Sequence, residues 1–375
     1  MINKESFFRS AAEMNNNDFL REGFGSSEIE SVSEKSTTNG LLHNQKEKTL
    51  HSTIQGVGRT NFPLLAIDGG GTKTIAVITD ADGNVLSSGK SGTSNYQVAG
   101  FKATIKTLKH VIKKAIGQLN ETIFHHDTEI NFNVGVFALA GIDTQKDEAN
   151  VQEIVKQVIE ESGVQINRVI VENDALSVLL GETNHSPGVI LISGTGSIAF
   201  AHDGMGHYAR AGGWGHRLGD EGGGYWIGKE AIRAILKMLD GRGPETVLSN
   251  LVLNHFQFEK YEQLYNWVYG PNYTIHDVGK LSTIVEEANQ LGDPVSKSIL
   301  DRAVSELYCL VSAVVKRANI SDEPFKLLFL GGVLQNSEYV KRELIYKVKD
   351  DMTDVDIITN HDNPIDLIVQ RGLNG

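Results

Sequence analysis

Two glycine-rich segments constrain this chain more than any other feature. The first reads AIDGGGTKT at residues 66–74, and the second reads ISGTGS at residues 192–197. An apolar run precedes each segment and another follows it, so both segments are predicted to be turns between strands. Glycine lets backbone N–H groups surround phosphate oxygens, and neighbouring Ser and Thr hydroxyls add donors. The pair therefore predicts two phosphate-binding loops and phosphoryl-transfer chemistry.

Neither turn has the Gly-x-x-x-x-Gly-Lys-Ser/Thr pattern of the loop that leads into a helix in P-loop nucleotide-binding proteins. A single glycine turn between strands is most often an ordinary tight hairpin. The presence of two turns, their hydroxyl side chains and the acid that leads the first one favour phosphate binding instead. That acid, Asp68, ends a predicted strand and could hold a hydrated Mg²⁺ against the phosphates.

The composition argues against several classes of function. With 375 residues and a net charge of −12, the chain offers little basic surface, so we expect no nucleic-acid or membrane partner. Its single cysteine, Cys309, excludes intramolecular disulfides, and the apolar stretch around it predicts a buried core thiol. No stretch approaches the roughly 20 apolar residues that cross a bilayer, and no signal-peptide pattern is present. We expect a cytoplasmic protein.

The order of the expected elements predicts two lobes of α/β class after a tail. Residues 1–60 are rich in Ser, Asn, Glu, Lys and Thr, and are predicted to be a disordered or extraneous tail. Residues 61–180 are the predicted N-terminal lobe, in which a meander precedes alternating helices and strands. Residues 181–375 are the predicted C-terminal lobe, which opens in the same way and then carries a helical insertion. Mixed sheets with helices on their faces follow from this order.

The expected strands and helices can be placed more closely. Predicted strands cover residues 64–68, 74–79, 85–89, 133–138, 168–172, 189–192, 197–202 and 326–330. Predicted helices cover residues 101–119 and 147–162, a helix is compatible with residues 4–21, and helices dominate residues 225–319.

Taken in order, these turns resemble those of the sugar kinase, Hsp70 and actin ATPase superfamily. The resemblance is closest to its N-acetylglucosamine kinase branch, within the BadF/BadG/BcrA/BcrD-type ATPase grouping, and covers about residues 63–345. The most specific string is GGWGHRLGDEG at residues 212–222, and LGGV at 330–333 is similar to the adenosine motif. The resemblance implies two actin-like, ribonuclease H-like lobes with the active site in the cleft between them.

The resemblance also implies roles for individual residues. Asp174 matches the catalytic carboxylate, a general base for the sugar hydroxyl, whereas capping of a helix by Asn173 or Asp174 is the alternative. Asp68 matches the metal site, holding Mg²⁺ through water. The implied ATP and phosphate contacts are Gly70, Gly71, Thr72, Lys73, Ser193, Gly194, Thr195, Gly196, Ser197, Gly331 and Gly332.

The substrate side follows from the same match. The implied sugar-binding residues are Asn95, Gly141, Asp143, Trp214, Gly215 and Asp220. Each side chain has a structural alternative: a turn residue for Asn95, a helix cap for Asp143, a core position for Trp214 and a solvated loop acid for Asp220.

The expected activity is ATP- and Mg²⁺-dependent phosphorylation of an amino sugar, most directly N-acetylglucosamine at its 6-hydroxyl. N-acetylmuramic acid or glucosamine kinase activity is an alternative, and so is a non-catalytic sensor that binds sugar and ATP. An electron-transfer activator would need more cysteine ligands than Cys309 provides. A homodimer is expected from the resemblance alone.

One departure from the family concerns the C-terminus. Residues 364–375 read PIDLIVQRGLNG, without the expected small-residue helix after the proline, so one edge of the N-terminal lobe is predicted to be uncovered.

Overall fold

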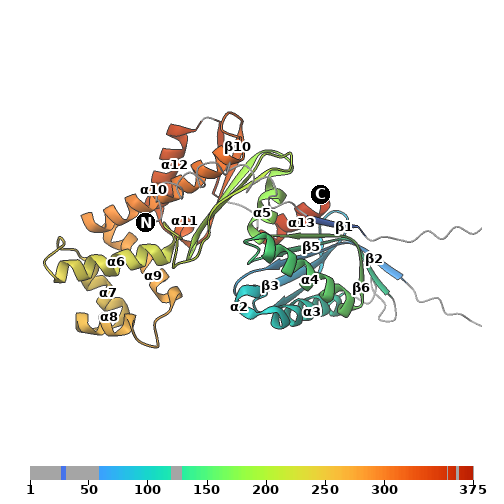
Figure 1. The fold of residues 1–375 in the computed structure, drawn as a ribbon, viewed down its shortest axis with the longest axis horizontal. Coiled ribbons are helices and arrows are strands. Elements are labelled where there is room, and N and C mark those ends of the chain that lie inside the picture. The colour runs from blue at the N-terminus through green and yellow to red at the C-terminus, as the bar shows by residue number, and fades with distance from the viewer. Residues whose placement is uncertain (1–26, 31–58, 120–128, 353, 360–362, 375) are drawn as a thin grey trace, which may run out of the picture. The chain divides into compact units, whose positions relative to one another are not determined.

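Two mixed β-sheets with the same strand arrangement organise the chain (Figure 1). The computed structural model describes residues 27–30, 59–119, 129–352, 354–359 and 363–374. The N-terminal unit comprises the described residues up to Glu182 together with the last helix, and the C-terminal unit begins at Thr183.

The first glycine turn lies in a hairpin of the N-terminal sheet. Strands β2 (Arg59–Gly69) and β3 (Thr74–Thr79) are antiparallel, and β4 (Val85–Ser91) continues the meander. Strands β5 (Glu129–Leu139) and β6 (Val164–Glu172) lie on the other side of β2 and run parallel to it, giving the order β6-β5-β2-β3-β4. The carboxyl ends of β2, β5 and β6 therefore lie at one edge of this sheet.

The C-terminal sheet repeats this arrangement around the second glycine turn. Strands β7 (Gly188–Ser193), β8 (Ser197–His202) and β9 (Tyr208–Gly212) form the meander. Strand β10 (Phe325–Leu330) runs parallel to β7, and β11 (Val355–Ile358) runs parallel to β10. The order β11-β10-β7-β8-β9 confirms the predicted internal repeat and the predicted α/β class.

Amphipathic helices bury their apolar sides against these sheets. In α3 (Phe101–Gly117), for example, Ile105, Leu108 and Ile112 recur at helical spacing and are buried. The N-terminal unit also contains α2 (Tyr96–Ala99), α4 (Gln145–Ser162), α5 (Asp174–Thr183) and α13 (Pro364–Asn374). The C-terminal unit contains α6 (Gly224–Leu239), α7 (Leu248–Phe256), α8 (Tyr261–Val268), α9 (Ile275–Gln290), α10 (Pro294–Arg317), α11 (Gly332–Asn336) and α12 (Glu338–Asp351).

The last helix, α13, corrects two predictions. It packs on the N-terminal sheet, so this segment does not belong with the predicted lobe at 181–375, and the edge predicted to be uncovered is covered. Leu367 and Ile368 are buried, and a Cβ on Gly372 would lie 2.5 Å from Leu64 Cδ1. The segment is not the small-residue helix that was expected. Its apolar spacing and the close approach of Gly372 to Leu64 nevertheless let it pack on the sheet.

Two further expectations concern the tail and the cysteine. Ser27–Glu30 form strand β1, which pairs antiparallel with β6, whereas a tail was predicted there; the rest of residues 1–58 lies outside the described residues. Cys309 is exposed, not buried as predicted, because it lies between the buried α10 positions Leu307 and Val311 and off their side of the helix. Within the described ranges, no helix combines the length and apolar character needed to span a membrane.

Candidate active site

The first glycine loop is a tight turn at the end of β2. The Gly70 N–H donates to Lys73 O at 2.9 Å, and the Thr93 hydroxyl donates to Gly70 O at 3.1 Å. Gly71, Thr72 and Lys73 are exposed at its tip, and a Cβ on Gly71 would meet nothing within 4 Å. The loop therefore offers open space and exposed donors, as a phosphate cradle requires.

The two serines of the second loop hydrogen-bond to the backbone of residues 221–222. Ser193 Oγ donates to Gly222 O at 2.8 Å, and Ser197 Oγ donates to Glu221 O at 2.6 Å. Both side chains are buried, whereas Thr195 is exposed at the tip. These two hydroxyls thus fasten the loop to residues 221–222, and Thr195 is left exposed at its tip.

Gly331, part of the segment predicted to be an adenosine motif, meets this second loop directly. Strand β10 pairs with β7 through Leu330 and Ile192, so Gly331 follows beside Ser193. Gly331 has a positive φ of 95°, and a Cβ there would lie 2.4 Å from Ser193 O. Only glycine fits this approach without displacement of the loop backbone. The start of α6 also reaches the loop, because the Tyr225 N–H donates to Thr195 O at 3.0 Å.

Three carboxylates gather at the carboxyl edge of the N-terminal sheet. In the strand register, Asp68 of β2 pairs with Ala138 of β5, which pairs with Glu172 of β6. Asp68 thus lies one residue before the end of β2, in the same row as Glu172, and Asp174 follows two residues after Glu172. Asp143 follows β5, and its charge acts on Asp174 together with that of Asp68. The carboxyl ends of parallel strands are where open α/β sheets bind ligands.

The half-buried carboxyl of Asp174 is shifted toward the neutral form. Burial raises its pKa from the ordinary 3.8 to about 6, against the lowering effect of the Ala175 N–H, and the negative charges of Asp68 and Asp143 raise it further. Burial likewise raises the pKa of Asp68, which the Lys73 ammonium lowers. A carboxyl near pKa 6 is a base at neutral pH that can still gain a proton.

The main capping contacts at the starts of α5 and α4 come from residues next to Asp174 and Asp143, not from these two acids. Asn173 Oδ1 accepts from the N–H groups of Ala175 at 2.9 Å and Leu176 at 3.3 Å, so Asn173 caps α5. Thr144 is the cap of α4, where its hydroxyl accepts from the Asp147 N–H at 3.2 Å. Neither candidate acid is therefore the principal helix cap.

Asn95 and Gly141 lie against each other beside these acids. Asn95 Oδ1 caps α2 by accepting from the Gln97 N–H at 3.0 Å. The oxygen of Asn95 therefore has the structural role that was the alternative to sugar binding. A Cβ on Gly141, whose φ is 92°, would lie 2.6 Å from that oxygen. Gln97 Nε2 donates to Gly141 O at 3.0 Å and to Asp143 Oδ2 at 3.2 Å. Among the described residues, none accepts from Asn95 Nδ2, which leaves this donor for a ligand.

The remaining predicted sugar residues belong to the C-terminal unit. Asp220 Oδ1 accepts from the Gly215 N–H at 3.2 Å, and a Cβ on Gly196 would lie 2.4 Å from Asp220 Oδ2. Burial raises the pKa of Asp220, while the Gly215 N–H lowers it. Trp214 is 65% exposed, with the Arg210 guanidinium 5.0 Å from its ring centre, so the core alternative for Trp214 is wrong.

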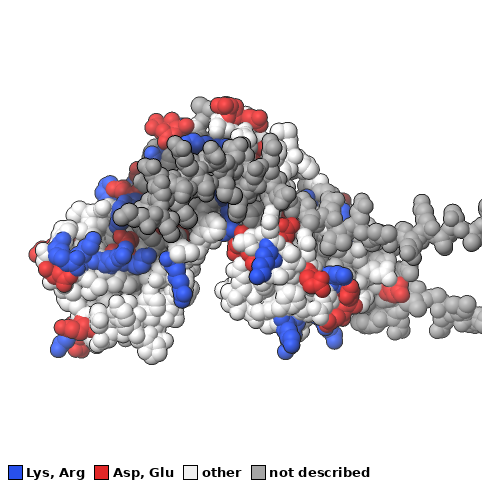
Figure 2. Space-filling model, in the orientation of Figure 1, with Lys and Arg blue, Asp and Glu red and all other residues white. Residues whose placement is uncertain are grey.

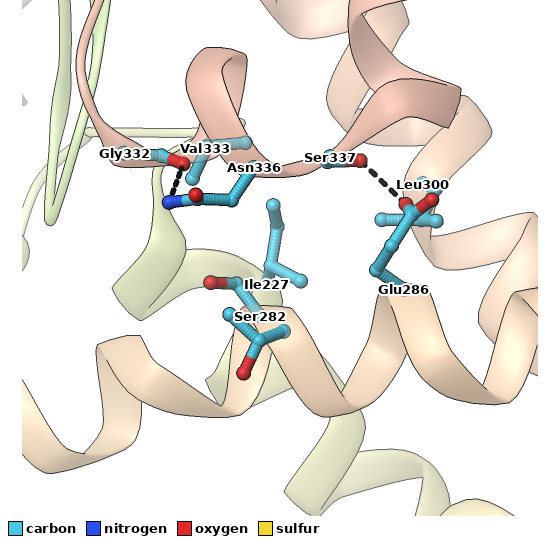
Figure 3. Close-up of a pocket in the computed structure, with 9 residues that line it drawn as sticks. Ile227, Ser282, Glu286, Leu300, Gly332, Val333, Asn336 and Ser337 are labelled. Atoms are coloured by element: carbon cyan, nitrogen blue, oxygen red, sulfur yellow. Dashed lines mark hydrogen bonds between the residues drawn. The ribbon is translucent and has the colours of Figure 1, made fainter.

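A small cavity beside Gly332 extends the candidate nucleotide site (Figure 3). It has a volume of about 10 Å³, room for about one water molecule. Asn336 Nδ2 donates to Gly332 O at 2.8 Å, and Ser337 Oγ donates to the buried Glu286 at 2.5 Å. Sequence reasoning missed its polar lining, Ser282, Thr283, Glu286, Asn336 and Ser337. None of these residues belongs to the LGGV motif at 330–333, although Asn336 lies one helical turn after Gly332.

A second groove lies between α6 and α10, with a volume of about 460 Å³. Its charged lining consists of Glu230 and three cations, and Figure 2 shows basic side chains gathered on the surface over α6. Arg233 and Arg302 both pair with Glu230, at 2.8 and 2.9 Å. This ion-pair group, in which the two Arg side chains are exposed and Glu230 is not, does not include any of the predicted site residues.

The fold and the two loops define a class of protein. Two mixed sheets of one topology, each with a glycine turn between its first two strands, form the fold of the actin-like ATPases. A crystal structure from Porphyromonas gingivalis, provisionally assigned as an N-acetylglucosamine kinase, has this fold. It matches with a TM-score of 0.61 and 22% identity, over 83% of this chain and 99% of that one.

The chain belongs to the BadF/BadG/BcrA/BcrD ATPase family, whose sequence pattern matches residues 65–369. An N-acetylmuramic acid/N-acetylglucosamine kinase of Clostridium acetobutylicum is 34% identical over 75% of this chain and 88% of its own length. An N-acetyl-D-glucosamine kinase of Dictyostelium discoideum is also 34% identical, over 80% of this chain and 94% of its own. Membership of an ATPase family implies ATP as the nucleotide.

Proposed function

We propose that this protein is an amino-sugar kinase that transfers the γ-phosphoryl group of ATP to the 6-hydroxyl of N-acetylglucosamine. The names of the two relatives at 34% identity support an N-acetylated amino sugar. N-acetylmuramic acid, which one of those names includes, is the first alternative substrate, and glucosamine is the second. A homodimer and a cytoplasmic location complete the proposal.

The observation that carries the proposal is the group of three carboxylates in the N-terminal unit. A sugar hydroxyl is a weak nucleophile, and a carboxylate within hydrogen-bond reach can accept its proton during phosphoryl transfer. Asp174, whose pKa is about 6, is the proposed general base. Because Asn173 caps α5, Asp174 does not have to serve as its cap.

The sugar is assigned to residues beside that base. We assign the Asn95 Nδ2 donor and the Asp143 carboxylate to sugar hydroxyls, with Gly141 allowing close approach through its missing side chain. On the C-terminal unit, the exposed Trp214 offers an aromatic edge, and Gly215 and Asp220 offer backbone and carboxylate contacts.

The nucleotide is assigned to both glycine loops and to Gly331 and Gly332. The open space at Gly71 and the exposed Thr195 and Lys73 fit a polyphosphate. When bound, Mg²⁺ neutralises phosphate charge, and the Asp68 carboxylate is the group we assign to hold it through water. Oxygen ligands of this kind suit Mg²⁺, so the residues present fit the proposed cofactor.

ADP release tests the proposal directly. The full chain is incubated with Mg²⁺ and ATP alone, and with N-acetylglucosamine, N-acetylmuramic acid, glucosamine or glucose. We expect N-acetylglucosamine to raise the rate most. If calorimetry shows sugar binding while no sugar raises ADP release, the protein is a sensor and the kinase proposal is wrong.

A further inference from the structure

A buried ion pair joins the last helix to the strand end that precedes Asp174. Arg371 of α13 donates from Nε to both Glu172 oxygens at 3.2 Å, and its Nη2 donates to Oε1 at 2.6 Å. The side chains are 12% and 1% exposed. An Arg fork on a carboxylate fixes direction as well as distance, because two donors engage one planar group.

Glu172 lies at the strand–helix junction that leads to Asp174. Glu172 ends β6, Asn173 caps α5, and Asp174 begins that helix. Asn173 Nδ2 also donates to Ile142 O at 3.4 Å, which fastens the junction on the β5 side. The Arg371 fork fastens the same junction at Glu172, one residue before Asn173.

A second contact shows that α13 also supports α5 itself. A Cβ on Gly181 of α5 would lie 2.0 Å from Leu367 O of α13, so the two backbones touch at this glycine. Figure 1 shows α5 and α13 side by side in the N-terminal unit. Helix α13 therefore touches both the strand before Asp174 and the helix after it.

We infer that Arg371 is a positioning residue for Asp174, acting through Glu172 on the β6–α5 junction. The inference rests on the proposed function of Asp174 as general base and extends it to the C-terminal helix. Displacement of a reacting group by about 1 Å can lower a rate by about 10²-fold. Loss of the fork is therefore expected to lower kcat with little effect on the binding of sugar or ATP.

The test must separate positioning from stability. Arg371→Met leaves the Glu172 charge buried without its partner, which destabilises a fold by itself. The double variant Glu172→Met/Arg371→Met removes both charges, so its thermal midpoint is expected to return toward that of the wild type. Arg233→Met removes an exposed Arg from an ion pair in the C-terminal unit and leaves Glu230 paired with Arg302, so it is the control.

Steady-state kinetics give the first readout. We expect Arg371→Met to lower kcat by about tenfold or more with KM values within about twofold, and Arg371→Lys to recover part of kcat. The double variant is expected to keep a low kcat despite its restored midpoint. A restored midpoint together with wild-type kcat in the double variant overturns the inference, as does unchanged kcat in Arg371→Met.

Hydrogen exchange gives a readout that does not depend on activity. Faster exchange at residues 173–177 is expected in Arg371→Met and in the double variant, and wild-type exchange is expected in the control. Unchanged exchange in both Arg371 variants overturns the inference. If the wild type releases no ADP with any sugar, the proposed function fails, whereas the exchange result still judges the effect of Arg371 on the junction.

Discussion

At the scale of single residues, Asp174 combines a raised pKa with the first position of α5, directly after the cap residue Asn173. Asn173 accepts from the Ala175 and Leu176 N–H groups, and Asp174 Oδ1 also accepts from the Ala175 N–H at 2.9 Å, a contact that an amide oxygen at position 174 can keep. We expect Asp174→Asn to lower turnover by about 10²-fold or more, since it removes the general base. ADP release gives the rate and calorimetry the sugar affinity, which should stay near that of the wild type.

The control for this change is Asp240→Asn, which alters an exposed acid paired only with Arg242 within the described residues. It is expected to retain full activity. Full activity in Asp174→Asn would show that another group accepts the proton.

The pH dependence of the reaction tests the raised pKa. A base must be deprotonated to act, so with a pKa of about 6 the activity is expected to fall as the pH drops below 6. We expect kcat/KM to decline about tenfold per pH unit below that value and to level off above it. Circular dichroism at each pH shows whether the chain stays folded, and a plateau extending down to pH 4 would contradict the assignment.

The raised pKa of Asp174 also predicts that ionisation of this carboxyl, which activity requires, lowers the stability of the folded chain. The folded state binds the Asp174 proton more tightly than the unfolded chain, where the pKa is 3.8. Its contribution to stability is therefore complete below pH 3.8 and is lost as the pH rises through 6. We expect Asp174→Asn to unfold at a higher temperature than the wild type at pH 7.5, by calorimetry. An equal or lower unfolding midpoint for Asp174→Asn at pH 7.5 would contradict the raised pKa of Asp174.

At the scale of elements, the contact between Gly331, which follows β10, and the second glycine loop predicts the effect of one added methyl group. A Cβ on Gly331 would lie 2.4 Å from Ser193 O, and the residue has a left-handed φ of 95°. Gly331→Ala is expected to displace the loop and weaken ADP binding by about tenfold or more, as measured by calorimetry. Gly117→Ala, where a Cβ meets nothing within 4 Å, is the control. Equal ADP affinity in the two variants would exclude a role for this contact.

Elements with a local signal could be predicted from the sequence. Strands 74–79 and 197–202 have the predicted bounds, because a glycine turn limits one end of each and apolar runs define the rest. Helix α13 was missed because its docking depends on Gly372 lying close against the Leu64 and Val136 side chains, which composition does not reveal. The exposure of Cys309 was missed because an apolar stretch was read without the phase of its helix.

The candidate site, too, could be predicted from the sequence only in part. The motifs located Asp68 and Asp174, but only the register of β2, β5 and β6 explains why these two acids share one sheet edge. The fork between Glu172 and Arg371 joins residues 199 positions apart in sequence. Such a pair has no local pattern, so only the folded chain shows it.

At the scale of the whole molecule, each unit holds one group of residues proposed for a single ligand: the base and its neighbours for the sugar, and the second glycine loop for the nucleotide. Each unit has its own sheet and its own buried core, so each can respond to a ligand locally. The acids near Asp174 belong to the N-terminal unit, whereas the second glycine loop and Gly331 belong to the C-terminal unit.

Hydrogen exchange with one ligand at a time tests this division. Mg²⁺-ADP alone is expected to slow exchange at residues 193–197 and 331–336, because a bound ligand lowers the population of locally open states. N-acetylglucosamine alone is expected to slow exchange at residues 93–97, 141–143 and 173–176. Glucose, which lacks the N-acetyl group, serves as the control and should protect the sugar segments less. Protection of 193–197 by the sugar alone, with none at 141–143, would reassign the sugar to the C-terminal unit and contradict the proposed site.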